Sequence, residues 1–165
     1  MRDAGPWIDA QCALWARIAA HDFDPPVPFS FTARLARDQR WRPRFARGAI
    51  EEYRRFCFLC VACPEQATPS EAVDAVWHQH LTYSRDYWEV WCANVLCRRL
   101  HHEPTKGGPA EDTRFRAQYA ATLACYETYF GPPPEAYWPG TVRRFAPPAR
   151  FPRLLLTASR RFGWT

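Results

Sequence analysis

Apolar side chains recur at helical spacing along much of the chain, and no segment shows the sustained alternation of apolar and polar residues that is typical of a strand. Residues 7–20 and 31–40 follow the helical spacing. A longer helix is expected over about 44–62, and another over about 112–130, where Gly131 and the prolines after it end the helix. The buried stripe of the 44–62 helix is expected to contain Phe45, Ala49, Tyr53, Phe56 and Cys60. This pattern predicts an all-α fold.

One more helix is expected to begin at the segment TPSE. Thr68 can act as its N-cap, Pro69 suits the first helical position, and Glu71 completes a capping box. The helix either runs straight to Leu96 or breaks near 82–84, where a hydroxyl side chain could cap a second helix. The pattern allows both outcomes.

Length and composition favour a single domain. The chain has 165 residues, of which 47% are hydrophobic and 16% aromatic, so it can bury a core without a metal or a disulfide. We expect a single compact domain of five to six helices over residues 1–140. Residues 141–165 are rich in proline and arginine and are expected to form a tail that packs on the domain or stays partly mobile.

Arginine dominates the charge of the chain, whose net value is +5. Six arginines and no acidic residue lie in 141–165, and six more lie in 34–47, interleaved with Trp41 and Phe45. Aromatic rings among arginines are typical of nucleic-acid binding, and such a surface could also recruit an acidic protein. Because no nucleic-acid motif accompanies these residues, a solvated helix face with two core aromatic side chains is the favoured interpretation.

The seven cysteines are interpreted as free thiols in a reducing cytoplasm. The N-terminal residues do not resemble a signal peptide, and the longest apolar run, 56–63, is too short to span a membrane. Cys57, Cys60 and Cys63 have the spacing that begins a ferredoxin cluster motif, but no fourth cysteine follows at the required distance. Three small core residues are therefore the favoured interpretation of this run.

Four of the five histidines form two pairs, His78 with His80 and His101 with His102. On a helix, Asp74 and His78 are four residues apart and share a face, whereas His80 points about 200° away from His78. Either the helix breaks here, or the two histidines have different roles. Residues 98–112 are a loop by their proline and glycine content, and an antiparallel return over 83–97 would bring the second pair beside the first.

Such an arrangement would create a site for a divalent metal ion, with zinc or iron as the expected ion. The expected ligands are Asp74, His78, His80, His101 and His102. Trp77 is expected to form an apolar wall, and Lys106, in the segment PTKGG, to bind an anionic group of a small substrate. The simpler interpretation of PTKGG is a tight loop that positions the second histidine pair.

The segment VDAVWHQHLTYSRDYWE resembles the D-x-x-W-H-x-H motif of the glycine-rich-domain-containing protein family. The blocks LHHEPTKGG and FGPPPEAYWP add to the resemblance, which extends over about 30–140. The resemblance implies a helical domain centred on Asp74, Trp77, both histidines of the first pair and both of the second. The glycine-rich tail that gives the family its name is missing, and the resemblance implies no particular reaction.

Two functions from different classes remain open. The first is a metal-dependent enzyme, either a hydrolase in which the ion lowers the pKa of a bound water or a non-haem iron enzyme. The second is a non-catalytic interaction module, in which the histidines and Trp77 form a buried polar network and the arginine-rich surfaces bind an acidic protein or RNA.

Overall fold

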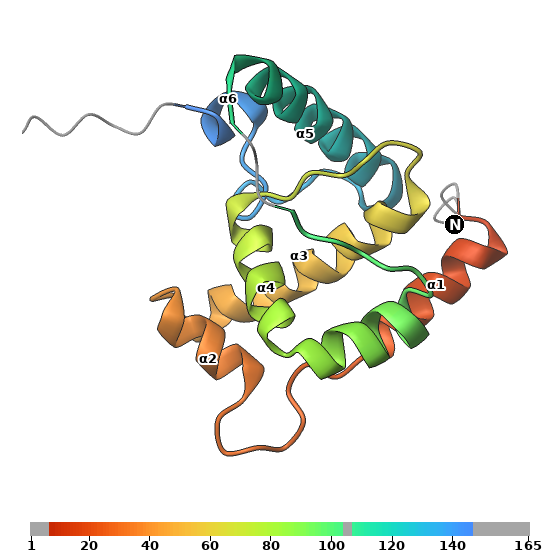
Figure 1. Cartoon of the computed structure of the whole chain (residues 1–165), viewed down its shortest axis with the longest axis vertical. Helices are drawn as coiled ribbons and strands as arrows, with labels where there is room; N and C mark the ends of the chain where they lie inside the picture. The colour runs from red at the N-terminus through yellow and green to blue at the C-terminus, as the bar shows by residue number, and fades with distance from the viewer. Residues whose placement is uncertain (1–6, 104–106, 147–165) are drawn as a thin grey trace, which may run out of the picture.

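Helix α3 (Pro43–Ala62) runs through the centre of the protein in the computed structural model, which describes residues 7–103 and 107–146 (Figure 1). Pro43 occupies the first turn, where its missing N–H costs nothing. Four other helices pack on α3, so it is buried on more than one face. Phe45 and Cys60, expected in its buried stripe, are only half-buried, whereas the polar side chains of Glu52 and Arg54 are buried.

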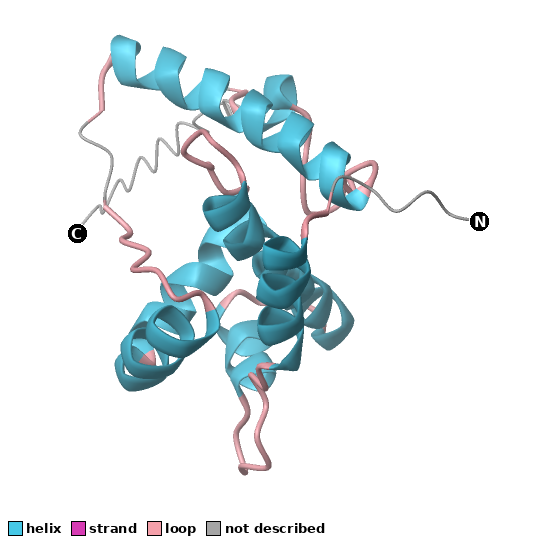
Figure 2. Ribbon diagram, turned by 90° about the vertical axis from the view of Figure 1, so that its right-hand side faces the viewer, coloured by secondary structure: helices cyan, strands magenta, loops and turns pink. Residues whose placement is uncertain are grey.

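Seven helices and no strand make up the described part of the chain, in one compact domain, which confirms the all-α prediction. The other six are α1 (Asp9–Ala20), α2 (Phe31–Asp38), α4 (Glu71–Thr82), the π-helix η1 (Asp86–Val95), α5 (Pro109–Phe130) and α6 (Thr141–Arg144). Seen from the side, the long helix α5 lies across one end of the others (Figure 2). The break at Tyr83 is one of the two outcomes that the sequence allowed and gives the sixth helix, whereas α6 is a seventh that forms where the tail was expected.

The start of α4 differs from the prediction. Ser70, not Thr68, is the N-cap, and its side chain accepts a hydrogen bond from the backbone N–H of Val73. Thr68 is instead held against α5, because its backbone N–H donates to the Thr122 hydroxyl at 2.9 Å. The expected cap at Thr68 is therefore wrong, because Thr68 contacts α5 and the helix begins two residues later.

Cys63 and Cys125 form a disulfide, with their Cα atoms 6.6 Å apart. The expectation that all seven cysteines are free thiols is therefore wrong for this pair. Cys63 caps the C-terminal end of α3 and Cys125 lies on α5, so the pairing follows from the packing of two helices that are distant in the sequence. Cys57 is a buried free thiol and Cys60 a half-buried one, which agrees with the core interpretation of the cysteine run.

Several expectations fall outside the described residues. These are most of the expected tail, from residue 147 onward, and Lys106. Among the residues that are described, no helix is both long and apolar enough to cross a membrane.

Candidate functional site

Helix α4 carries His78 and His80 on different sides, as their spacing requires. Each meets a second histidine and an aspartate, so the described residues contain two separate histidine–aspartate groups. We call Asp74, His78 and His102 the cleft cluster, and His21, His80 and Asp86 the buried cluster. The five residues expected to bind one metal ion therefore do not lie together: Asp74, His78 and His102 share the cleft cluster, whereas His80 belongs to the buried cluster.

In the cleft cluster, both imidazoles present their Nε2 atoms to each other and to the carboxylate. His102 Nε2 lies 2.8 Å from Asp74 Oδ1 and 3.0 Å from His78 Nε2, and His78 Nε2 lies 3.6 Å from Asp74 Oδ2. The His78 side chain is 60% exposed and that of His102 18% exposed, so the cluster is open to solvent on one side. Three donor atoms thus converge on one point that a small molecule can reach.

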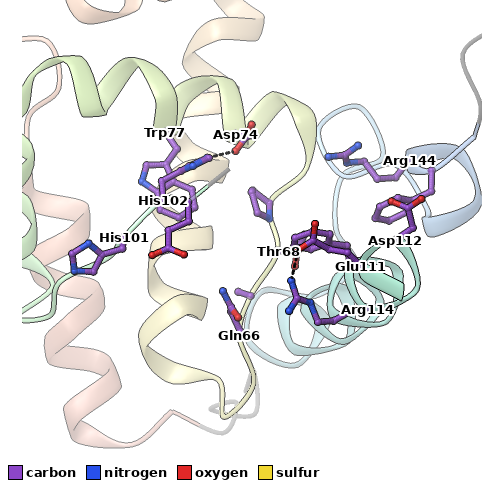
Figure 3. Close-up of a pocket in the computed structure, with 15 residues that line it drawn as sticks. Gln66, Thr68, Asp74, Trp77, His101, His102, Glu111, Asp112, Arg114 and Arg144 are labelled. Carbon is purple, nitrogen blue, oxygen red and sulfur yellow. Dashed lines mark hydrogen bonds and ion pairs between the residues drawn. The ribbon is translucent and has the colours of Figure 1, made fainter. Parts of the chain in front are cut away.

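The cleft cluster lies at the edge of a cleft of about 740 Å³. Figure 3 shows Asp74, Trp77 and His102 on one side of this cleft and Arg144 and Arg114 on the other. The lining contains both signs of charge, with the carboxylates of Glu103 and Asp112 among the acidic groups. The Arg144 guanidinium donates to Glu71 at 3.0 Å, while its buried Nε atom has no hydrogen-bond partner among the described residues.

Trp77 holds His102 in place rather than only forming a wall. Its ring meets the His102 ring edge to face, with centroids 4.4 Å apart. The side chain of His101 points away from Asp74 and His102 (Figure 3), and its ring packs on Trp88, with centroids 5.4 Å apart. His101 lines the cleft but is not part of either cluster.

In the buried cluster, two histidine Nε2 atoms meet one carboxylate oxygen. Asp86 Oδ2 lies 2.8 Å from His80 Nε2 and 3.3 Å from His21 Nε2. The other ring nitrogen of His80, Nδ1, lies 3.0 Å from the hydroxyl of Tyr53, which is fully buried. Since an ionised carboxylate can only accept, the neutral His80 ring donates from Nε2 to Asp86 and accepts from Tyr53 at Nδ1.

Burial sets the protonation of the buried cluster. It lowers the pKa of His21 and of His80 below the ordinary histidine value, although the charge of Asp86 opposes both shifts. The hydrogen bond from His80 lowers the pKa of Asp86. At neutral pH both imidazoles are therefore uncharged and the carboxylate is ionised, which is the protonation state in which these groups bind a metal.

A family model named UCP032817-like matches residues 30–128, which is more than half of the chain. The chain belongs to the UCP032817-like family. No curated protein and no solved structure matches it. Membership of the UCP032817-like family assigns no activity, so the function must be argued from the site.

This result corrects the resemblance to the glycine-rich-domain-containing protein family, which is wrong. The motif D-x-x-W-H-x-H spans seven residues of α4, about two helical turns, and so short a motif does not define a family. The segment that matches the UCP032817-like family contains the whole cleft cluster, together with His80 and Asp86. His21 lies before it.

His21 and Asp86 were not expected to take part in a site. His21 lies 59 residues before His80 and belongs to no motif. Asp86 had a weak signal: it follows His80 by six residues and stands just after 82–84, where one of the two allowed outcomes placed a break. The turn at Tyr83 brings Asp86 back against His80 at the first residue of η1.

The arginine-rich segment 34–47 uses its aromatic side chains for packing within the chain. Trp41 and Phe45 pack edge to face at 4.9 Å, and Phe45 packs on Tyr137 at 4.6 Å. Both side chains are half-buried, so part of each ring packs within the chain and the nucleic-acid interpretation of this segment stays a prediction.

Proposed function

We propose that Asp74, His78 and His102 bind a divalent metal ion, zinc or iron(II), and that the ion acts on a small substrate in the adjoining cleft. The observation that supports this most directly is the convergence of two Nε2 atoms and a carboxylate at the edge of a cleft of about 740 Å³. Bonds of about 2.0–2.1 Å from one ion to its ligands place neighbouring ligand atoms roughly 3–3.4 Å apart. The distances of 2.8, 3.0 and 3.6 Å in the cleft cluster lie around that range.

Two histidines and one carboxylate leave coordination positions for water or substrate. In zinc enzymes with three protein ligands, the remaining position holds a water whose pKa is lowered, and this water hydrolyses the substrate. The exposed side of His78 leaves room for such a ligand. We therefore propose a metal-dependent hydrolase. The same donor set is typical of iron(II) oxygenases, which makes non-haem iron chemistry the second candidate.

The cleft offers cationic groups to a negatively charged substrate. Arg144 and Arg114 line the cleft, and a guanidinium recognises carboxylate and phosphate groups. Lys106 remains the proposed second contact to that anionic group. The proposed substrate is accordingly a small molecule with an anionic group, held beside the metal-bound water.

The alternative is a cleft cluster that only stabilises the packing of α4, in an interaction module without catalysis. His102 and Asp74 form a hydrogen bond of 2.8 Å, as a packing network would. The open face of His78 argues against this role, because a polar network built for packing is expected to be buried.

Elemental analysis of protein purified without chelators tests the proposal, with His102→Gln beside His101→Gln. The two histidines are adjacent in sequence, but only His102 belongs to the cluster, so His101→Gln is a matched control. We expect His102→Gln to hold one equivalent of metal less than the wild type and His101→Gln to hold the same amount. Equal metal in all three proteins, or no zinc or iron binding by any of them, would refute the proposal and favour the interaction module.

A further inference from the structure

We infer that a second divalent metal ion binds at the buried cluster, with His21 Nε2, His80 Nε2 and the Asp86 carboxylate as its ligands. This site does not depend on the cleft cluster, since the two share no residue. Three features of the buried cluster support this site: an unsatisfied nitrogen, the distances between the donor atoms, and the groups that orient the rings.

The unsatisfied nitrogen is Nε2 of His21. The His21 side chain is only 8% exposed, and this atom is buried without a hydrogen-bond partner among the described residues. Asp86 Oδ2 lies 3.3 Å away but not in the geometry of a hydrogen bond. Buried polar atoms are nearly always satisfied, so an orphan that faces a carboxylate and a second imidazole needs an explanation. A cation between the three groups supplies one, because it binds the lone pair of each.

The donor atoms are already close to coordination distances. Both Nε2 atoms approach the same oxygen of Asp86, at 2.8 and 3.3 Å. Ligand atoms on a zinc ion lie roughly 3–3.4 Å apart, as bonds of about 2.0–2.1 Å require. Small rotations of the three side chains would make room for an ion, and these are easiest at Asp86, whose side chain is 38% exposed. The same exposure gives the ion a route of entry.

The second nitrogen of His80 has the kind of partner that metal-bound histidines have. Its Nδ1 atom lies 3.0 Å from the Tyr53 hydroxyl, which can donate to the free ring or accept from the metal-bound ring. Phe23 and Trp91 enclose the His80 ring edge to face, at 5.0 and 5.5 Å, and limit its rotation. The ring therefore presents Nε2 in a fixed direction.

Arg54 is a positive charge close to the buried cluster, and its field lowers the pKa of both His21 and His80 after the larger effect of burial. That charge is partly compensated by Glu51, whose carboxylate lies 3.1 Å from the Arg54 guanidinium. Arg54 also donates to the backbone carbonyl of His21 at 2.7 Å, so it fixes the backbone of the proposed ligand.

The ligands come from three elements, which suggests what the ion does. His21 caps the end of α1, His80 lies in α4, and Asp86 is the first residue of η1. An ion bound there would connect these elements and stabilise the fold, since ligands that bind only the folded state oppose unfolding. The proposed role is structural, in contrast to the open cleft cluster.

Zinc titration of the metal-free protein by calorimetry tests this inference, using Asp86→Asn, His102→Gln and the double variant. Asp86→Asn keeps the shape of a half-exposed side chain, so it should fold, and circular dichroism checks that it does. We expect two zinc equivalents in the wild type, one in each single variant and none in the double variant. Zinc should raise the melting temperature of His102→Gln but not that of the double variant.

The design separates the two proposals. If Asp86→Asn binds as much zinc as the wild type, the buried site is wrong, whatever His102→Gln does. If zinc is lost in Asp86→Asn and kept in His102→Gln, the buried site stands and the cleft cluster is not a metal site. Tyr53→Phe removes no ligand but should weaken the buried site about 10–100-fold, and an unchanged affinity would also count against the inference.

Discussion

The indole Nε1 of Trp77 donates a hydrogen bond, 2.8 Å long, to the hydroxyl oxygen of Tyr87. The same hydroxyl donates to the backbone carbonyl of Leu100, two residues before His102. Trp77 itself precedes His78 and packs on the His102 ring. Tyr87 thus ties α4 to the segment that carries His102, so the cleft cluster is positioned by a side chain that is not a member of it.

Tyr87→Phe should therefore weaken zinc binding without removing a ligand. The variant leaves the Trp77 N–H and the Leu100 carbonyl without their partner, which we expect to cost about 1–3 kcal/mol of unfolding free energy. Zinc affinity at the cleft cluster should fall roughly 10–100-fold, as for the loss of an orienting group. Urea unfolding and zinc titration measure the two effects. As a control, Tyr129→Phe removes a hydroxyl that is hydrogen-bonded to Gln11 at 2.8 Å, and it should leave the zinc affinity unchanged. Equal zinc affinities in Tyr87→Phe and the wild type would contradict the positioning role of Tyr87.

Stability of the metal-free protein should decrease as the pH falls below about 6.5. Burial lowers the pKa of His21 and His80, so the unfolded chain takes up these protons at a higher pH than the folded one. At a pH above the pKa of histidine in the unfolded chain, both histidines are neutral in both states, so their burial costs no stability. As the pH is lowered from the histidine pKa of the unfolded chain to that of the folded protein, the free energy of unfolding decreases. The decrease is at most about 1.4 kcal/mol per pH unit for each histidine.

Urea unfolding at pH 7.5 and pH 5.5, with a chelator present, measures this dependence. His21→Gln should reduce the difference between the two pH values, because one of the two titrating groups is gone. His101→Gln removes an exposed histidine outside the buried cluster and should keep the wild-type difference. A wild type whose stability is the same at both pH values would show that burial does not control these two groups.

The buried carboxylate of Glu52 should be essential for folding. It accepts hydrogen bonds from Arg55 at 2.6 Å, Tyr126 at 2.7 Å and Trp138 at 2.9 Å. Glu52→Ala leaves these donors unsatisfied and should cost about 3–5 kcal/mol of unfolding free energy. Glu51→Ala removes the neighbouring carboxylate, which is 59% exposed, and should cost less than about 1 kcal/mol. Chemical denaturation compares the two variants, and similar costs for both would contradict the importance of the buried network.

The disulfide between Cys63 and Cys125 should stabilise the fold. It joins residues 62 positions apart, and closing a loop of that length is worth about 2–4 kcal/mol. Adding a reductant should therefore lower the melting temperature of the wild type, whereas a Cys63→Ser/Cys125→Ser variant should melt lower and not respond. Cys12→Ser removes an exposed free thiol and should behave like the wild type. If the reductant shifts the double variant as much as the wild type, the effect does not come from this disulfide.

The positions of most helices, and which residues share a face of each helix, could be predicted from the sequence. The all-α fold, the helix over 44–62 and the helix ending at Gly131 all follow from apolar spacing and from residues that stop helices, which act over a few positions. The placement of Asp74 and His78 on one face, with His80 on another, is equally local. The start of α4 was predicted wrongly: Thr68 was expected as its cap, but Thr68 contacts α5 and Ser70 caps the helix.

The sequence by itself determined which side chains each helix can present, because the geometry of a helix depends only on neighbouring residues. The tertiary structure alone decided the partners: His102 rather than His101 meets His78, and His21 and Asp86 meet His80. The same holds for the pairing of Cys63 with Cys125. These contacts join residues from separate elements, so they depend on how whole helices pack around α3. The spacing of residues within one helix carries no information about that packing.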